Sequence, residues 1–170
     1  LIQHNVEALK AAGVKKVVTS CAGCFHALKS EYPEIIGNLP FEIVHSSEVM
    51  AELIESGKIS LDTEIAKTFT YHDPCHLCRG QGIKKEPRAL LAAAGEYKEM
   101  KDSDVCCGGG GSFFMDYPDI SDSIIDKKRR NIEATGADVV VTGCPGCLIQ
   151  LNKAAKASGK FKALHISQVL

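Results

Sequence analysis

The amino-acid sequence predicts an α/β fold with two pseudo-repeated units, each a short and mostly parallel sheet flanked by helices, the first unit incomplete. Two observations lead to this prediction. Short runs rich in β-branched residues alternate with longer helical patterns, as in parallel strands joined by helical crossovers. The chain also matches itself after a shift of 123 residues, which places Cys21 on Cys144 and Cys24 on Cys147.

The first unit is predicted over residues 1–60. Helices are indicated by apolar residues at helical spacing with a glycine or proline stop, and strands by short β-branched runs. The elements expected in order are a helix over 1–12, a strand over 14–19, a helix over 25–31 ending near Pro33, a strand over 41–45, and a helix from Ser46 or Ser47 to Gly57.

The second unit is predicted over residues 61–170. Its central run, Val139 to Val141, is apolar throughout, which is typical of a strand buried on both faces. The elements expected in order are a strand over 67–72, a turn-rich loop over 73–82, a helix over 86–94, a strand over 96–100, a helix over 120–135, a strand over 138–142, a helix from the 144–147 motif to 157, a strand over 161–165, and a last helical turn capped by Ser167.

The repeat extends beyond the cysteines, because residues 41–49 match 161–169 and His45 falls on His165. Cys75 and Cys106–Cys107 precede the second copy, whereas nothing comparable precedes the first. We therefore expect a longer protein with two complete units, of which this chain lacks the front of the first. The repeated histidines favour a shared structural role, such as a bond from Nδ1 to a backbone carbonyl beside each cysteine motif.

Composition excludes several classes of function. The formal net charge is −1, and the one basic cluster, residues 127–130, lies on an expected helix beside Asp122 and Asp126. That pattern predicts a solvated helix face rather than a nucleic-acid partner. No apolar run approaches the roughly 20 residues of a membrane span, and no secretory signal is present. We expect a cytoplasmic protein.

Eight cysteines are too many for an ordinary intracellular domain of this size. Six form pairs with two residues between the cysteines, and two are adjacent: Cys21 and Cys24, Cys75 and Cys78, Cys106 and Cys107, Cys144 and Cys147. The clustering favours metal or cluster ligation over thiol redox chemistry or structural disulfides. Two of the motifs lie where a strand ends and a helix begins, where free N–H groups favour the thiolate form that binds metal.

The stretch 105–112 places Cys106 and Cys107 in front of four glycines. Adjacent side chains of a strand point to opposite faces, so two neighbouring thiols need unusual backbone freedom to serve one site. The thiols expected to converge at the carboxyl ends of the strands are Cys75, Cys106, Cys107, Cys144 and Cys147. Zinc or a cubane cluster takes four such ligands, and zinc held by four of the five remains open.

These motifs together resemble the cysteine-rich CCG domain. The residues that carry the resemblance are 71–77 (Tyr-His-Asp-Pro-Cys-His-Leu), 106–113 (Cys-Cys-Gly-Gly-Gly-Gly-Ser-Phe) and the 144–147 motif. The family includes heterodisulfide reductase catalytic subunits and the iron–sulfur subunits of glycolate, lactate and glycerol-3-phosphate oxidising complexes. Residues 79–82 and 134–138 look most similar to the glycolate and lactate oxidase branch.

The resemblance implies a 4Fe–4S cluster of noncubane form held by Cys75, Cys106, Cys107, Cys144 and Cys147, with zinc as the alternative. Cys21 and Cys24 match the last motif of a preceding unit and would be metal ligands there, so that centre, and even the complete one, can be empty in this shortened chain. The implied function is electron transfer in a flavin-linked hydroxyacid oxidoreductase, with a flavoprotein partner and a further electron acceptor. Disulfide cleavage at the cluster, as in heterodisulfide reductase, and a zinc-stabilised interaction module are the competing functions. Partner subunits could hold the protein at the cytoplasmic face of the membrane.

Four other side chains near the motifs carry less specific expectations. Cys78 is an extra thiol that we expect not to be a ligand. His72 and His76 flank Cys75, and either a hydrogen bond to a cluster sulfur or ordinary loop packing would account for them. Arg79 either offsets cluster charge or lies on the surface.

Overall fold

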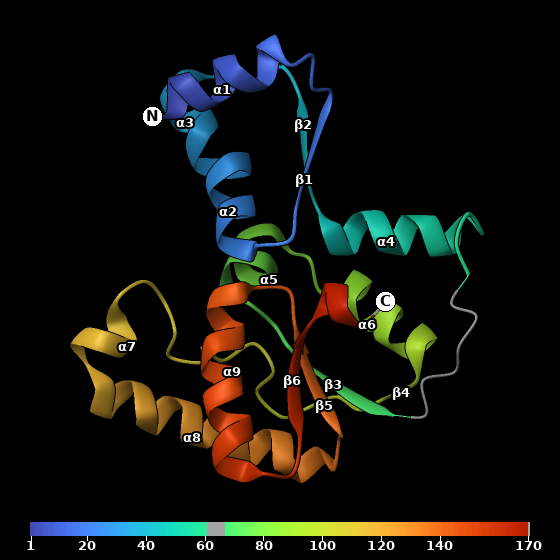
Figure 1. Ribbon diagram of the computed structural model, residues 1–170, viewed down its shortest axis with the longest axis vertical. Coiled ribbons are helices and arrows are strands. Elements are labelled where there is room, and N and C mark those ends of the chain that lie inside the picture. The colour runs from blue at the N-terminus through green and yellow to red at the C-terminus, as the bar shows by residue number, and fades with distance from the viewer. Residues whose placement is uncertain (61–66, 170) are drawn as a thin grey trace.

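The structure is a computed structural model that describes residues 1–60 and 67–169. It contains two parallel sheets with helices packed around them, as the sequence predicts (Figure 1). The smaller sheet pairs β1 (Lys16–Thr19) with β2 (Glu42–His45). The larger sheet has the order β4-β3-β5-β6, formed by Glu96–Tyr97, Thr68–His72, Val139–Thr142 and Lys162–His165. Every strand pair among the described residues is parallel.

Helices connect these strands. The first half contains α1 (Ile2–Ala11), α2 (Ala22–His26), a π-helical turn (Ala27–Glu31), α3 (Tyr32–Ile36) and α4 (Ser46–Glu55). The second half contains α5 (Cys75–Gln81), α6 (Lys85–Ala94), α7 (Phe113–Asp116), α8 (Pro118–Thr135), α9 (Pro145–Ser158) and a final 3-10 turn (Ile166–Gln168). The helices α1, α4, α6, α8 and α9 and most strands lie where the sequence predicts them. The strand predicted over 96–100 is only Glu96–Tyr97, the helix predicted from residue 25 begins at Ala22, and α7 was not predicted.

The prediction of a loop over 73–82 is wrong, because α5 occupies most of this stretch. Pro74 is the residue before the helix, with extended backbone, where its missing N–H costs no helical hydrogen bond. Gly82 ends the helix in the left-handed region, with φ of 72°. The cluster of Pro and Gly residues therefore marks the two ends of a short helix.

The helical segment after Cys24 also does not stop near Pro33. The π-helical turn joins α2 to α3, and Pro33 lies at the start of α3. A proline in the first turn of a helix forfeits a backbone N–H that would have no partner there, so the segment continues to Ile36.

Histidines, rather than the predicted serines, cap two helical segments. The His45 ring accepts a bond from the Ser47 backbone N–H (3.3 Å), and Glu48 accepts from the His45 N–H (2.8 Å). The same reciprocal capping box recurs with His165 before the final 3-10 turn. The predictions of Ser46, Ser47 and Ser167 as caps are therefore wrong by one or two positions.

The larger sheet is covered on both faces. Val139 and Val141 of β5 face a core that α6 and α4 complete, while Val140 faces a second core lined by α8 and α9. All four residues of β5 are buried, which explains its uninterrupted apolar run. This layering leaves the carboxyl ends of β3 and β5 as the place where side chains can gather.

The two halves are interlocked through their helices. The core of the first half, built around Phe25 and Ile43, includes Leu77 of α5 and the nearby Ile83 from the second half. In the opposite direction, α4 of the first half packs its Met50 and Ile54 on the core of the larger sheet. Figure 1 shows α5 lying directly beneath α2 and α4 beside α6.

Candidate metal centre

Three helices begin around one cavity of about 220 Å³. Cys21 and Cys144 are the residues immediately before α2 and α9, and Cys75 is the first residue of α5. Free backbone N–H groups and the positive end of the helix dipole favour negative charge at such positions. The cysteines that line the cavity are Cys21, Cys75, Cys106, Cys107, Cys144 and Cys147.

The cavity brings together all five thiols that the sequence singled out, and it adds Cys21 from the first half. Cys24, predicted as a metal ligand beside Cys21, is exposed and is not among the lining residues. Cys78 is only 3% exposed, does not line the cavity and lies among the apolar core residues. The first and second halves therefore both contribute cysteines to this cavity.

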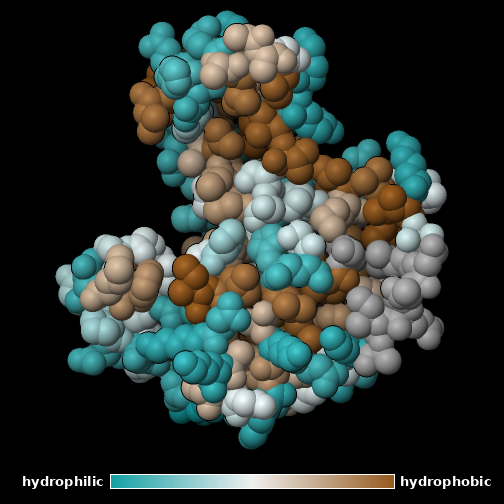
Figure 2. All heavy atoms as spheres, viewed as in Figure 1, coloured by the Kyte–Doolittle hydropathy of each residue, from teal (hydrophilic) through white to brown (hydrophobic). Residues whose placement is uncertain are grey.

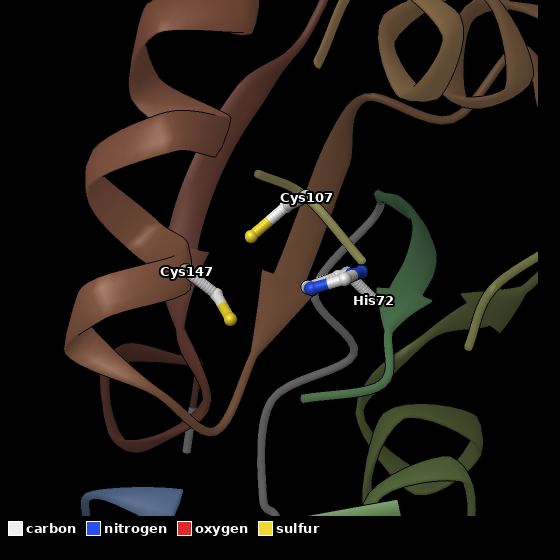
Figure 3. Close-up of side chains that lie close together, drawn as sticks. All are labelled: His72, Cys107 and Cys147. Atoms are coloured by element: carbon white, nitrogen blue, oxygen red, sulfur yellow. The ribbon is translucent and has the colours of Figure 1, made fainter. Parts of the chain in front are cut away.

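His72, Cys107 and Cys147 form the tightest group in the cavity, with potential ligand atoms within 4.8 Å of one another. They come from the end of β3, the glycine loop and α9, and Figure 3 shows the His72 ring facing both sulfur atoms. His72 is 1% exposed, and its Nδ1 atom is buried without a hydrogen-bond partner. A buried polar atom without a partner beside grouped thiols is consistent with a site built for a further group.

Interactions among the grouped thiols shift their pKa values in opposite directions. Bonds from Cys106, Cys147 and His72 hold the pKa of Cys107 far below its ordinary value despite burial. A bond from Cys147, helped by backbone N–H groups of Cys147, Gly146 and Gly23, lowers the pKa of Cys144 to about 5.

Interaction with Cys107 and Cys144, together with burial, raises the pKa of Cys147, and interaction with Cys107, together with burial, raises that of Cys106. The surroundings thus favour the thiolate form at Cys107 and Cys144. Thiolate is the form of cysteine that binds metals.

The glycine loop is shaped by contact with α8 and α9. A Cβ at Gly109 would lie 2.8 Å from Gln150 Cγ and 3.1 Å from the Gly146 carbonyl oxygen. Gly108 has φ of 80°, and its carbonyl accepts a bond of 2.9 Å from Ser121 Oγ. The glycines therefore allow the loop to approach α9 closely with both thiols turned to one cavity.

The repeated histidines brace the two halves reciprocally. His45 Nε2 donates to the carbonyl of Gly143, next to Cys144 (3.1 Å). His165 Nε2 donates to the carbonyl of Ser20, next to Cys21 (2.8 Å). The predicted bond to a carbonyl beside each motif is confirmed, but the donor is Nε2 instead of Nδ1, and each histidine reaches the motif of the other half.

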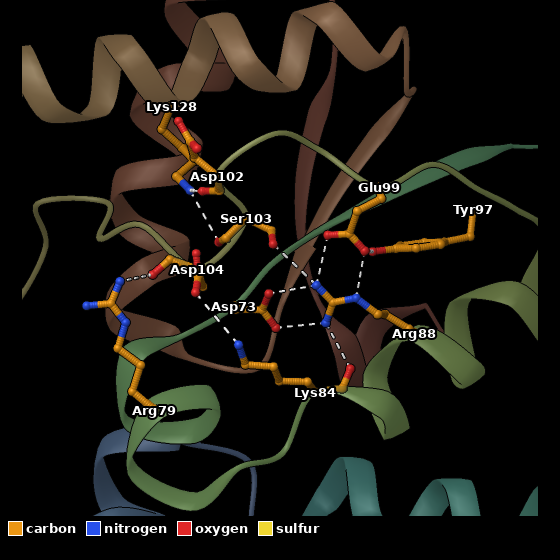
Figure 4. Close-up of polar contacts among 10 residues, drawn as sticks. All are labelled: Asp73, Arg79, Lys84, Arg88, Tyr97, Glu99, Asp102, Ser103, Asp104 and Lys128. Atoms are coloured by element: carbon orange, nitrogen blue, oxygen red, sulfur yellow. Dashed lines mark hydrogen bonds and ion pairs between the residues drawn. The ribbon is translucent and has the colours of Figure 1, made fainter.

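The segment just before Cys106 is held by side chains from two helices (Figure 4). The carbonyls of residues 101–104 accept bonds from Asn131, Lys128 and Arg79, with Lys128 binding two of them. The backbone N–H of Asp73 also donates to Ser103 (3.1 Å). Arg79, for which either a charge-offsetting or a surface role was predicted, is exposed and binds the carbonyl of residue 104.

The prediction of a solvated face over 127–130 is wrong at Lys128, which is 2% exposed. The signal was present in the sequence, because Lys128 lies between Ile125 and Ile132 at helical spacing and shares their buried face. Sequence reasoning also missed Arg88, which forms two bonds with the buried Asp73 (2.7 and 2.9 Å) and two with Glu99. Asp73 lies two residues before Cys75, so this network fixes both ligand-bearing segments.

The donor set of the cavity decides which groups fit. Thiolate sulfur is a soft ligand that selects zinc, copper(I) or iron–sulfur clusters over magnesium or calcium. Two thiolates, further thiols and a buried imidazole fit such a group well. In the described part of the chain, no helix is both long and apolar enough to cross a membrane.

Comparison with known proteins agrees with this chemistry. A family model described as CCG, a cysteine-rich domain, matches residues 1–29 and 69–152. The chain is 42% identical over 153 residues to a subunit of the dihydromethanophenazine:CoB–CoM heterodisulfide reductase of Methanosarcina mazei, covering 86% of this chain and 37% of that protein.

Two further relatives align with the whole chain. It is 34% identical over 184 residues to the EtfAB:quinone oxidoreductase of Syntrophomonas wolfei, covering 26% of that protein. It is 32% identical over 185 residues to the probable glycolate oxidase iron–sulfur subunit of Bacillus subtilis, covering 41% of that protein. The chain therefore spans less than half the length of these relatives.

Proposed function

Because the chain belongs to the cysteine-rich CCG domain family, we propose that it is an iron–sulfur electron-transfer module of a multi-subunit oxidoreductase. The observation that carries this proposal is the cavity lined by six cysteines, two of which have surroundings that favour the thiolate form. The relatives named as oxidoreductase subunits and iron–sulfur proteins support the same role.

The proposed ligands are Cys75, Cys106, Cys107, Cys144 and Cys147, and the proposed cofactor is a 4Fe–4S cluster of noncubane form. When bound, such a cluster accepts and releases single electrons. The chain's own residues hold it by thiolate sulfur, offset its negative charge with the N-termini of α2, α5 and α9, and shape its surroundings with the glycine loop. Zinc is the alternative occupant of the same thiols.

We further propose that a flavoprotein subunit oxidises a hydroxyacid of the glycolate or lactate type and passes its electrons to this module, which delivers them to a separate acceptor. The similarity to the probable glycolate oxidase iron–sulfur subunit supports this assignment. The proposed location is the cytoplasm, or the cytoplasmic face of a membrane through partner subunits.

A second candidate is disulfide cleavage at the cluster, as in a heterodisulfide reductase. The 42% identity to a heterodisulfide reductase subunit favours it over a zinc-stabilised interaction module. In that case the electrons flow from a donor through the centre into a disulfide, yielding two thiols for two electrons and two protons. The two candidates share the metal centre and differ in where electrons enter and leave.

The domain organisation is part of the proposal: residues 1–60 are the back half of a first CCG unit and residues 61–170 are a complete second unit. The two stretches matched by the family model support this division. The open side of β1 supports it too, since β1 pairs only with β2 among the described residues, and Val18 is 52% exposed where its repeat equivalent Val141 is 0% exposed. Figure 2 shows hydrophobic residues over this region. Cys21 and Cys24 would belong to the first unit's centre, with Cys21 also lining the cavity described above.

The test is metal and sulfide analysis with EPR on protein purified without oxygen. We expect iron and sulfide in the wild type, near-complete loss in Cys75→Ser, and wild-type content in the matched control Cys78→Ser, whose thiol lies in the core. About one zinc per chain without iron would overturn the electron-transfer proposal. Equal loss in both variants would overturn the ligand assignment.

The two candidate reactions are separated with the loaded protein. Reduction of the centre by a hydroxyacid in the presence of its flavoprotein partner supports the first. Oxidation of the pre-reduced centre by a disulfide, without any flavoprotein, supports the second and contradicts the first.

A further inference from the structure

Lys128 is a buried cation beside the loop that carries Cys106 and Cys107. Its side chain leaves α8, is 2% exposed, and donates from Nζ to the carbonyls of Asp102 and Ser103 (Figure 4). Burying an ammonium group is costly unless another charge compensates it. A buried lysine in this position therefore calls for a negative charge nearby.

No carboxylate forms an ion pair with Lys128 within 4.0 Å in residues 1–60 and 67–169. The carboxylate of Asp102 is 3.8 Å from the exposed Lys127 instead, and Lys128 reaches only its backbone carbonyl. Burial lowers the pKa of Lys128, and the foremost charge that opposes this effect is the Cys107 thiolate, followed by Asp102, Asp73 and Asp104. Lys128 thus interacts with the Cys107 thiol as well as with these carboxylates, and its Nζ is bound to the segment that leads into Cys106 and Cys107.

We propose that the Lys128 ammonium offsets the negative charge of the cysteine-held centre and thereby raises its reduction potential. This inference rests on the proposed function, because it needs an electron-accepting group on these cysteines. A reductant that adds one electron makes the centre more negative by one charge and moves no proton. A fixed cation nearby stabilises the reduced form more than the oxidised form.

Lys128 also holds the loop, but it does not hold it alone. Asn131 binds the carbonyl of residue 101 (2.8 Å), Arg79 binds that of residue 104 (2.9 Å), and the Asp73 N–H binds Ser103. These other bonds keep the segment in place when only the charge of Lys128 is removed. The electrostatic and positional roles are therefore separable by substitution.

The internal repeat sharpens the inference, because Lys128 coincides with Asn5 after the shift of 123 residues. Asn5 donates to the Tyr32 hydroxyl (2.9 Å) and carries no charge. The position equivalent to Lys128 in the first unit therefore carries no cation.

The experiment is an EPR-monitored redox titration with dithionite on the anaerobically purified, cluster-loaded protein. Lys128→Gln keeps an N–H donor and removes the charge, Lys128→Arg keeps the charge, and Lys127→Met removes an exposed neighbouring charge as the matched control. We expect a more negative midpoint potential in Lys128→Gln and wild-type potentials in the other two. A fully loaded Lys128→Gln protein with an unchanged potential, or an equal shift in Lys127→Met, overturns the proposal.

A second measurement tests the role of the Lys128 charge without a bound cluster, and it applies if Lys128→Gln, or every preparation, loses the cluster. The rate of thiol alkylation by iodoacetamide in the reduced, metal-free protein at one fixed pH reports the thiolate population. We expect slower alkylation in Lys128→Gln than in Lys128→Arg or wild type, and equal rates overturn the charge role. A wild-type protein without iron defeats the proposed function while this comparison still decides the role of Lys128.

Discussion

Gly109 occupies the position in the cysteine loop where a side chain has the least room. A Cβ there would meet Gln150 Cγ at 2.8 Å and the Gly146 carbonyl at 3.1 Å, and backbone cannot yield as a flexible side chain can. At Gly110 nothing lies within 4 Å of the same added atom. Close packing therefore requires a glycine at position 109, whereas it leaves room for a side chain at position 110.

This contrast gives a prediction at the scale of one methyl group. Gly109→Ala should destabilise the fold by about 2 kcal/mol through overpacking and reduce the iron content, because the loop must move away from α9. Gly110→Ala should change neither quantity measurably. Thermal unfolding and iron analysis of both variants decide this, and equal behaviour of the two would show that the Gly109 contact does not position the loop.

The residues that line the cavity could be predicted from the sequence where they occur at a spacing typical of metal ligands. The five thiols of the cavity follow from the cysteine pattern and from where strands end. Cys21 could not be assigned to the same cavity, because its position depends on how the two halves pack. The burial of Lys128 was not predicted, because a charged side chain is ordinarily assigned to the surface. Only its helical spacing from Ile125 and Ile132 indicates that it lies on the buried face.

At the scale of elements, short helices and their ends were the hardest to predict. The strands follow from local apolar patterns, whereas α5 is marked by prolines and glycines that also signal loops. The caps of α4 and of the final turn use histidine, a residue that ordinary capping preferences do not select. Local preferences were overruled at these places by bonds to distant residues.

Arg88 links three elements and is the basis of a prediction about them. It joins Asp73, whose side chain is 1% exposed, to Glu99, whose pKa falls to about 2 because the bonds from Arg88 and Tyr97 outweigh burial. Arg88→Met would leave the Asp73 carboxylate buried without its partner, which should cost about 3–5 kcal/mol. Urea unfolding of the reduced, metal-free protein measures this change.

The matched control is Arg130→Met, which breaks an exposed pair with Asp126 and should cost no more than about 0.5 kcal/mol. Adding Asp73→Asn to Arg88→Met should recover part of the loss, because the stranded charge is removed. A loss in Arg88→Met no larger than in the control would contradict a structural role for this network.

At the scale of the whole molecule, the reciprocal histidines join the halves. The His45 ring must be neutral, because Nε2 donates to a carbonyl and Nδ1 accepts from the Ser47 N–H. Burial accordingly lowers its pKa to about 4 from the ordinary 6.5. The unfolded chain then binds a proton more readily than the folded one, so stability is complete above pH 6.5 and declines as the pH falls toward 4.

Lowering the pH from 7 to 5 should therefore cost about 2 kcal/mol at this one ring, at roughly 1.4 kcal/mol for each pH unit below 6.5. His45→Gln, which cannot titrate, should be less stable at pH 7 but show a shallower decline. Urea unfolding of both proteins across this range tests the difference. Parallel pH profiles of the two proteins would contradict a contribution of His45 to acid sensitivity.

The hydrogen bonds of His45 and His165 also constrain the order in which the chain folds. They join residues that are 98 and 145 positions apart, so neither can form before distant parts of the chain have collapsed together. During synthesis, the hydrogen bond to the Ser20 carbonyl cannot form until His165, 145 residues later, has been added to the chain. We expect the cavity to close late in folding, so that insertion of a cofactor follows the meeting of the two halves.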